Sequence, residues 1–243
     1  MSDHRKVLQI GALGALLFPA IWTLRGRLEI AKDYVLVNVI KRRQTVADRV
    51  AQYGYDVHER LQPALSRAGV AYPPASLTLV VLKKEKRLEL YAADGGAFKL
   101  IKSYPVLAAS GELGPKLREG DYQVPEGIYR IESLNPNSLY HLALRVNYPN
   151  EFDREKARAD GRTQLGGDIM IHGNRVSIGC VAIGDKAAEE VFVLAAETGL
   201  ANVQVILSPV DFRRTSAPAT RDRPSWTPTL YARIRGELIK LKP

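Results

Sequence analysis

The chain opens with a long apolar run, ahead of any alternating pattern. Residues 7–24 carry no charge, and only Gln9 and Thr23 are polar among them. A helix of these 18 residues would be about 27 Å long, just under the hydrocarbon thickness of a bilayer. We predict a signal anchor or a signal peptide over residues 1–27, and we favour the uncleaved anchor because no A-x-A cleavage site is evident. A buried helix of a soluble protein is the third interpretation.

The next segment has the period of an amphipathic helix. Apolar side chains recur at steps of three and four between Val46 and Leu65, which predicts a helix with one apolar face over residues 42–69. Pro63 leaves the end of this helix undefined. Tyr72-Pro73-Pro74 then breaks the chain, so we assign residues 28–75 to a helical spacer and start the next domain at residue 76.

From residue 77 the apolar and polar positions follow the period of strands. We expect strands over 77–82, 88–91, 98–107, 127–131, 142–146, 168–172 and 202–207. Asp94-Gly95-Gly96 predicts a turn ahead of the third strand. A helix is expected over 185–198, with Asp185 as its cap and Gly199 at its end. Residues 76–210 are therefore predicted to form one domain that is mainly β with flanking helices.

Composition and charge narrow the class of protein. Hydrophobic residues make up 46% and charged residues 25%, which is ordinary for a globular chain. The net charge is +9, and residues 211–243, predicted to be a basic, proline-containing tail, hold eight Lys or Arg and three Asp or Glu. Such an excess favours an anionic partner such as acidic lipid or cell wall, although most excesses of this size are solvated surface. The sequence has no zinc-finger or RNA-binding signature, so we expect no nucleic acid partner.

Cysteine usage points to one residue. Cys180 is the only cysteine, so a disulfide within the chain is impossible. A single cysteine in an exported protein is either a reactive thiol or an intermolecular link. A buried, inert thiol is the alternative.

Candidate chemistry lies in the segment that contains this cysteine. His172 ends an apolar strand eight residues ahead of Cys180. A thiol attacks a carbonyl group as its thiolate and needs a base, and His172 could take that proton and later return it to a leaving amine. The other ring nitrogen could donate to a backbone carbonyl near Gly173. Backbone N–H groups of Gly179 and Cys180 could bind the oxyanion of a tetrahedral intermediate.

These two residues alone leave other interpretations open. A histidine at the end of a strand is usually only a satisfied polar side chain. No metal or other cofactor is expected, because His172 and Cys180 are two ligands and the remaining histidines, His4, His58 and His141, have no suitable spacing. A serine hydrolase is disfavoured because the chain has no G-x-S-x-G element.

A wider set of motifs resembles a known family. His172-Gly173 followed by Ser177-x-Gly179-Cys180 resembles the signature of the L,D-transpeptidase catalytic domain, or YkuD-like, family. The stretches 114–121 and 125–130 also resemble these enzymes. Residues 135–140 and 147–150 resemble one branch, the YafK-like murein proteins. The resemblance covers roughly residues 77–207.

Membership of this family would imply a β-sandwich catalytic domain that acts on peptidoglycan stem peptides. By this resemblance, Cys180 attacks the carbonyl of the L-centre of a diamino acid, and the thioester passes to an amine or to water. Two positions depart from many relatives, which have histidine at the place of Ile178 and arginine at the place of Ala182. Because that arginine could bind a substrate carboxylate, Arg175 and Arg145 are candidates to replace it, together with Ser177 as a substrate contact.

The sequence therefore predicts an exported, peptidoglycan-directed cysteine acyltransferase in the periplasm or otherwise outside the cytoplasm, anchored in the inner membrane by its N-terminal helix. One alternative is an L,D-amidase or peptidase that hydrolyses a murein-linked peptide or lipoprotein bond, as some members of the YafK-like branch are thought to do. Another is an inactive module that binds peptidoglycan. A murein-linked lipoprotein is a further candidate partner.

Overall fold

The computed structural model describes residues 43–219 and 222–241, so the predicted membrane segment over 7–24 lies outside the described residues. None of the helices within the described ranges is long and apolar enough to cross a bilayer. Residues 44–243 cluster into one compact unit, and the fold below is that of this unit.

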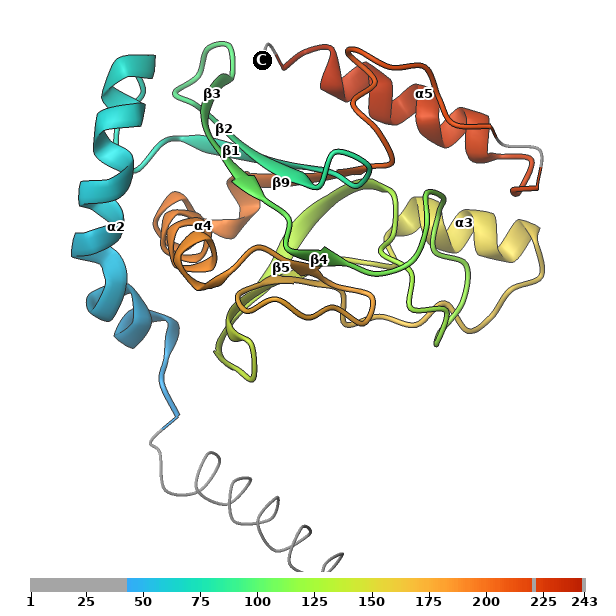
Figure 1. The fold of residues 1–243 in the computed structure, drawn as a ribbon, viewed down its shortest axis with the longest axis horizontal. Coiled ribbons are helices and arrows are strands. Elements are labelled where there is room, and N and C mark those ends of the chain that lie inside the picture. Colours follow the sequence, from blue (N-terminus) through green and yellow to red (C-terminus); the bar gives the residue numbers. More distant parts are fainter. Residues whose placement is uncertain (1–42, 220–221, 242–243) are drawn as a thin grey trace, which may run out of the picture. The chain divides into compact units, whose positions relative to one another are not determined.

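Nine strands join into one sheet in this unit, in the order β3-β2-β1-β9-β5-β6-β7-β8-β4 (Figure 1). The strands are β1 Ser76–Leu82, β2 Arg87–Ala93, β3 Lys99–Pro105, β4 Ala108–Ala109, β5 Gly127–Ser138, β6 His141–Val146, β7 Met170–His172, β8 Val181–Ala182 and β9 Val203–Ser208. The helices are α2 Val46–Ala68, α3 Glu151–Ala159, α4 Asp185–Thr198 and α5 Thr227–Leu238, and a 3-10 turn covers Leu200–Asn202. The prediction of a mainly β fold with flanking helices is confirmed.

Strand β5 connects the two halves of the sheet. Its first four residues, Gly127 to Arg130, pair with β9, and the pairing with β6 begins at Ile131. Figure 1 shows β1, β2 and β9 in one layer and β4 with part of β5 in the other. The inner faces of both halves contribute to one buried cluster, for example through Leu79 and Ile171. The expected sandwich is thus a single continuous sheet that bends along β5.

Helix α2 packs on this core through one apolar face. Val57, Leu61 and Leu65 are fully buried, as the helical period predicted. The helix continues past Pro63 to Ala68. Gly69 then ends it in the left-handed conformation.

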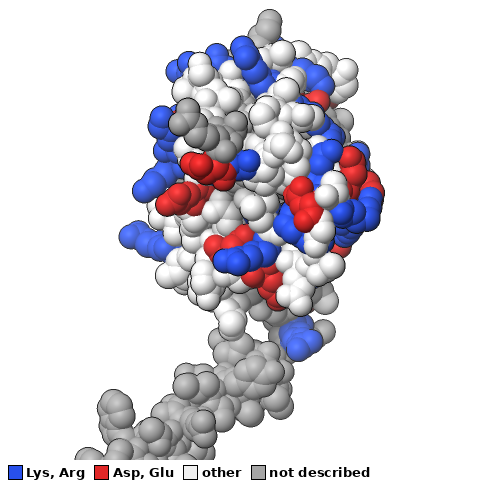
Figure 2. Space-filling model, turned by 90° about the vertical axis from the view of Figure 1, so that its right-hand side faces the viewer, with Lys and Arg blue, Asp and Glu red and all other residues white. Residues whose placement is uncertain are grey.

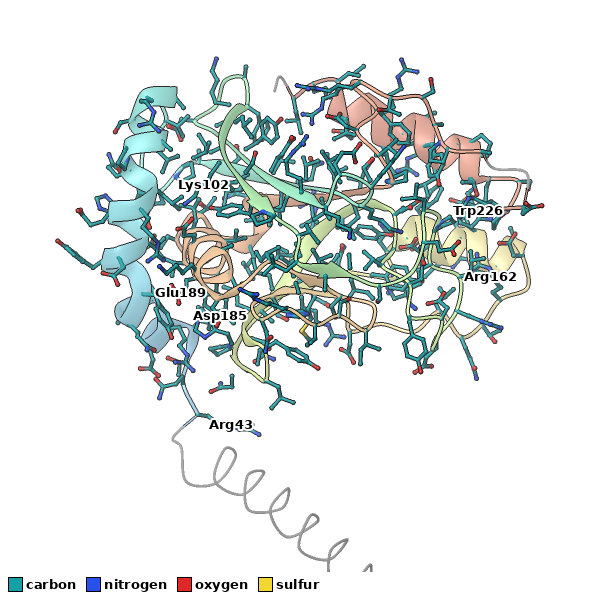
Figure 3. The ribbon with its side chains drawn as sticks, in the orientation of Figure 1. Arg43, Lys102, Arg162, Asp185, Glu189 and Trp226 are labelled. Atoms are coloured by element: carbon teal, nitrogen blue, oxygen red, sulfur yellow. The ribbon has the colours of Figure 1, made fainter. Side chains whose placement is uncertain are left out.

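Charged side chains also bind α2 to α4 and β3. The Arg60 guanidinium lies 3.0 Å from Glu189 and 2.7 Å from Glu190, and Lys102 on β3 lies 2.7 Å from Glu190. Figure 3 shows Glu189 and Lys102 beside the packed helices. The predicted boundary at residue 75 therefore separates two elements within one packed unit.

The segment after residue 210 also belongs to this unit. Helix α5 buries Leu230, Tyr231, Ile234 and Leu238 against the outer face of the sheet, in a second cluster with Val80. At the start of α5, Trp226 donates to Asp160, and Arg162 lies 5.8 Å from the Trp226 ring centroid (Figure 3). What the sequence predicted as a basic tail thus covers apolar sheet surface.

On the face that Figure 2 presents, Lys and Arg side chains lie beside Asp and Glu side chains in the middle and lower parts, and they predominate along the upper and left margins. Where charges of opposite sign are neighbours they offset one another in water, which is typical of solvated surface.

We expect α5 to contribute to the stability of the whole unit. Replacing the fully buried Ile234 by alanine should lower the free energy of unfolding by about 2–5 kcal/mol, because it leaves a cavity under the helix. Replacing the exposed Arg235 on the same helix should change it by less than about 0.5 kcal/mol. Urea denaturation measures both. Equal, small effects would mean that α5 does not pack in solution.

Candidate active site

Strand β7, which ends at His172, lies beside strand β8, which begins directly after Cys180. They pair in parallel, with Ile171 beside Val181 and His172 beside Ala182. Ile171 and Val181 point into the core, so His172 and Ala182 lie on the outer face. Cys180 directly precedes β8, in a bend where Gly179 has a φ of 95°, so the alternation of side chains along the strand does not extend to it.

The connection between these strands spans only residues 173–180. Parallel neighbours usually need a crossover of a dozen or more residues. Here the strands have three and two residues, so the chain has to return by only about 10 Å at 3.3 Å per residue. A connection of this length between His172 and β8 is therefore compatible with parallel pairing of β7 and β8, because both strands are short.

His172 is buried and its ring is held from two sides. Its Nδ1 lies 2.6 Å from the Gly173 carbonyl oxygen, and the Tyr140 ring stacks on it with centroids 4.7 Å apart. A carbonyl oxygen only accepts hydrogen bonds, so Nδ1 carries the proton and Nε2 keeps the lone pair that a base needs. Burial lowers the pKa of His172, while the bond to Gly173 opposes that effect.

Close packing around position 173 leaves room only for glycine. A Cβ atom at this position would lie 2.6 Å from Asp185 Oδ1 and 2.8 Å from the Tyr140 carbonyl oxygen. The sequence predicted Asp185 as the cap of α4, and this prediction is wrong. Gly184 occupies the cap position, and the Asp185 carboxylate accepts from the Asn174 N–H at 2.7 Å. The predicted end of α4 at Gly199 is confirmed.

Cys180 is partly exposed, and its thiol lies 3.6 Å from the Asp168 carbonyl oxygen. Burial raises the pKa of the Cys180 thiol, a backbone hydrogen bond from Met170 lowers it, and the negative charge of Asp168 adds to the rise. With a raised thiol pKa and a lowered imidazole pKa, the free protein holds a neutral thiol and a neutral histidine near pH 7.

Two serines fix the loop that carries the cysteine. Ser177 Oγ donates to the Cys180 carbonyl oxygen at 2.6 Å and accepts from the Ser110 N–H at 3.2 Å. Ser110 Oγ accepts from the Gly179 N–H at 2.5 Å and donates to the Tyr122 carbonyl oxygen at 2.7 Å. Ser177, a predicted substrate contact, here closes the turn ahead of Cys180.

These bonds correct one prediction about the oxyanion site. The Gly179 N–H is already engaged by Ser110, so it cannot also bind an oxyanion in this conformation. The Cys180 N–H makes no hydrogen bond to any part of the chain that the structure describes. The Cys180 N–H is therefore the candidate oxyanion donor that remains. Gly179 has a φ of 95°, a backbone conformation that favours glycine and that shapes the loop ahead of Cys180.

The two candidate arginines differ in their surroundings. Arg145 on β6 lies beside Met170 in the sheet and pairs with Glu132 and Asp168, each at 3.1 Å. Arg175 is exposed in the loop, and the only hydrogen bond found for it within the described residues is that of its backbone N–H with Asn174. Arg175 is thus the more available of the two, and Arg145 fixes the acidic side chain near the thiol.

Neither Ser110 nor Tyr140 was predicted as a site residue, because both lie far from the His–Cys segment along the chain. Tyr140 falls within the 135–140 stretch that resembles the YafK-like branch, but that resemblance assigned it no role. The pattern Ala109-Ser110-Gly111 at the end of a strand suggests only a turn. Exposed apolar side chains also surround the site segments, with Ile178 69%, Tyr122 63% and Leu139 82% exposed. No group of three or more potential metal ligands is found within residues 43–219 and 222–241.

Fold and site together define a β-rich protein with a bent sheet, in which a histidine strand lies beside the strand that follows a cysteine loop. Residues 76–206 match the family YkuD, the L,D-transpeptidase catalytic domain. The chain therefore belongs to the L,D-transpeptidase catalytic domain family, as its motifs suggested.

Individual relatives are similar over part of their length. The chain is 39% identical over 168 residues to YafK, a candidate L,D-transpeptidase of Escherichia coli (strain K12), and the match covers 67% of this chain and 62% of YafK. Among solved structures, the helical cell shape determining protein Pgp2 of Campylobacter jejuni is 24% identical with a TM-score of 0.45, covering 56% of this chain and 48% of Pgp2. Bd1075 of Bdellovibrio bacteriovorus is 19% identical with a TM-score of 0.41, over 70% of this chain and 56% of its own.

The surroundings of Cys180 predict its reactivity in the free protein. Alkylation by iodoacetamide should have a pH midpoint above about 8.5, the ordinary value for a thiol, because burial disfavours the thiolate. Cys180 is the only cysteine, so the label reports on it alone. The same chain unfolded in denaturant is the control and should return to the ordinary midpoint. A native midpoint well below it would mean a preformed thiolate, contrary to this geometry.

Proposed function

We propose that the protein is a peptidoglycan-directed cysteine acyltransferase, with Cys180 as the nucleophile and His172 as its base. The observation that carries the proposal is the parallel pairing of β7, which ends at His172, with β8, which begins directly after Cys180. Family membership supports the same chemistry. The substrate under this proposal is the diamino-acid carbonyl of a stem peptide.

The reaction begins with the thiol. Cys180 Sγ bonds to the substrate carbonyl carbon while His172 Nε2 takes the thiol proton, and the carbonyl electron pair moves to oxygen. The Cys180 N–H donates to this oxyanion. When the intermediate collapses, the bond to the leaving amine breaks, and that amine takes the proton from His172. A thioester on Cys180 remains.

An acceptor then attacks the thioester. His172 removes a proton from an amine or from water, the carbon–sulfur bond breaks, and the proton returns to Cys180. An amine acceptor gives a cross-linked or attached product, and water gives hydrolysis. The alternative activity, an L,D-amidase or peptidase on a murein-linked peptide or lipoprotein, uses the same residues with water as the acceptor.

The resting protonation states fit a base that acts during the attack. The lowered pKa of His172 keeps the imidazole neutral as the pH falls below its ordinary range, so it can accept a proton there. The raised pKa of Cys180 means that the thiol loses its proton as the new bond forms. Arg175 is proposed as the cation for a substrate carboxylate, because its guanidinium has no partner within the described residues.

One observation favours a binding module instead. The Gly179 N–H is occupied by Ser110, which would suit a site that holds peptidoglycan without cleaving it. Under either proposal the protein works where peptidoglycan is, outside the cytoplasm, with the apolar run over 7–24 as its membrane anchor.

Replacing Cys180 by alanine should abolish turnover of purified muropeptides. Mass spectrometry of the digest separates cross-linked dimers from trimmed monomers, so the wild-type products also identify the acceptor. Because the Cys180 side chain is not part of the core, urea denaturation of the variant should match the wild type. Full turnover by the alanine variant would rule out the proposal, and a wild-type protein that binds muropeptides but never changes them would favour the binding module.

Ser110 tests whether the cysteine loop must be held in place. Ser110→Ala removes the acceptor of the Gly179 N–H, so we expect kcat to fall about 10–100-fold with little change in KM. The matched control is Ser103→Ala on β3, whose exposed side chain makes no hydrogen bond with the described residues. Wild-type kcat in the Ser110 variant would show that the loop keeps its position without this contact.

A further inference from the structure

An open groove of about 720 Å³ lies on the outer face of the other half of the sheet. It is bordered by the start of α3, the end of α5 and the strands β1, β9 and β5, and none of the residues of the Cys180 loop lines it. Ligand pockets commonly have volumes of about 300–1,000 Å³, so a groove of this size can hold part of a larger ligand.

Three polar side chains form a row across the floor of this groove. Thr78 on β1 pairs with Gln204 on β9, and Gln204 pairs with Arg130 on β5. Paired residues lie on the same face, and this face is the outer one because Val80 and Ile206, two residues farther along, pack under α5. We call Thr78, Gln204 and Arg130 the polar row.

The polar row has few partners inside the protein. Thr78 is fully buried, yet its hydroxyl oxygen makes no hydrogen bond within the described part of the chain. The Gln204 side-chain amide likewise has no hydrogen bond among residues 43–219 and 222–241. The Arg130 guanidinium makes one long contact, 3.4 Å, to the Ala201 carbonyl oxygen. Thr78 is thus a buried hydroxyl without a partner, and the half-buried Gln204 amide and the exposed Arg130 guanidinium leave polar groups free for a partner from outside the chain.

The charge of the groove indicates the sign of that partner. Its two carboxylates are already paired, Glu151 with Arg158 and Glu237 with Lys240. Arg130 and Arg233 make no salt bridge with the described residues, and Arg233 is held over the Phe152 ring at 4.7 Å from its centroid. Arg233 acts on the Glu155 carboxylate only through its charge, so both guanidinium groups have hydrogen-bond donors left over, and their planar forks match the carboxylates of an anionic ligand.

The remaining lining favours a polyhydroxylated ligand over a lipid. Amide side chains of Asn147 and Asn202 flank the polar row, and the half-buried Phe98 supplies an apolar surface at the margin. Amides and hydroxyls both donate and accept, as sugar hydroxyl and acetamido groups do. Asn147 Oδ1 already accepts from the Arg130 N–H, and Asn202 Nδ2 already donates to the Thr198 carbonyl oxygen, so the other half of each amide is left for a ligand. An acyl chain would leave these remaining groups and the Gln204 amide without partners.

We propose that this groove binds a glycan strand of the cell wall that carries carboxylate-bearing peptides. The inference rests on the proposed function for the class of ligand, and it adds a second contact with the same polymer away from Cys180. Holding the polymer at the groove raises the local concentration of its peptides at the catalytic face.

Co-sedimentation with purified insoluble peptidoglycan tests the groove directly. The double variant Arg130→Ala, Arg233→Ala should weaken binding at least tenfold. The control double variant Arg154→Ala, Arg235→Ala removes the same charge from exposed positions on α3 and α5, and it should change binding less than twofold. Equal losses in both double variants, or wild-type binding by the groove variant, would overturn the proposal.

Thr78→Val gives a second test, because it removes the unsatisfied hydroxyl and keeps the shape of the side chain. The urea midpoint of the free protein should stay the same or rise, whereas peptidoglycan binding should weaken severalfold. A variant that unfolds more easily, or that binds as well as the wild type, would contradict a role for the polar row in binding.

Two further measurements separate this site from the catalytic one. Cys180→Ala should still sediment with peptidoglycan, and the groove variants should keep wild-type turnover of small soluble muropeptides. If Cys180→Ala loses turnover but still sediments, the catalytic residue and the groove are separate. The turnover of this variant therefore tests the catalytic proposal alone. Vesicles of anionic phospholipid form the competing arm: if the groove variants lose vesicle binding but keep peptidoglycan binding, the groove recognises lipid phosphates and the glycan proposal is wrong.

Discussion

The pairing of β7 with β8 is the constraint on which the candidate site depends. These strands have three and two residues, and they lie in parallel although only residues 173–180 connect them. Such a tight return fixes two things at once. It sets His172 in the strand beside β8, which begins directly after Cys180, and it forces the connection into a loop that needs external support. That support comes from β4, which pairs with the other edge of β8, and from Ser110 directly after it.

Support for the loop extends to the segment that follows Ser110. Buried Lys83 donates to the Gly114 and Val124 carbonyl oxygens and to Glu126, which pins both ends of that segment against β1. Arg223, close to the start of α5, approaches Gly114 so closely that a Cβ there would lie 1.5 Å from its guanidinium. The C-terminal segment therefore contacts the segment that follows Ser110, and Ser110 in turn contacts the cysteine loop. Residues after 210 thus belong to the same packed domain as the candidate site.

Much of this architecture follows from local sequence patterns. The period of the apolar residues predicted α2, α4 and most long strands, because each buries one regular face. Helix α3 was missed, although Asn150 and Asp153 form a capping box there, because its nine residues bury only Ala157. Strands β4 and β8 have two residues each and carry no periodic signal. For the site, spacing and family resemblance identified His172 and Cys180, and the hydrogen bond of His172 with Gly173 was anticipated. Ser110 and the engagement of the Gly179 N–H depend on contacts between distant residues, which no local pattern encodes.

In the proposed reaction a thioester forms on Cys180. The most direct test is to mix the protein with purified muropeptides, quench with acid within the first turnovers, and determine the mass of the peptide that contains Cys180. We expect the mass of this peptide to increase by that of the acyl donor, and we expect no such increase when His172 is replaced by alanine. Turnover without any adduct on Cys180, or an adduct on another residue, would contradict the proposed reaction.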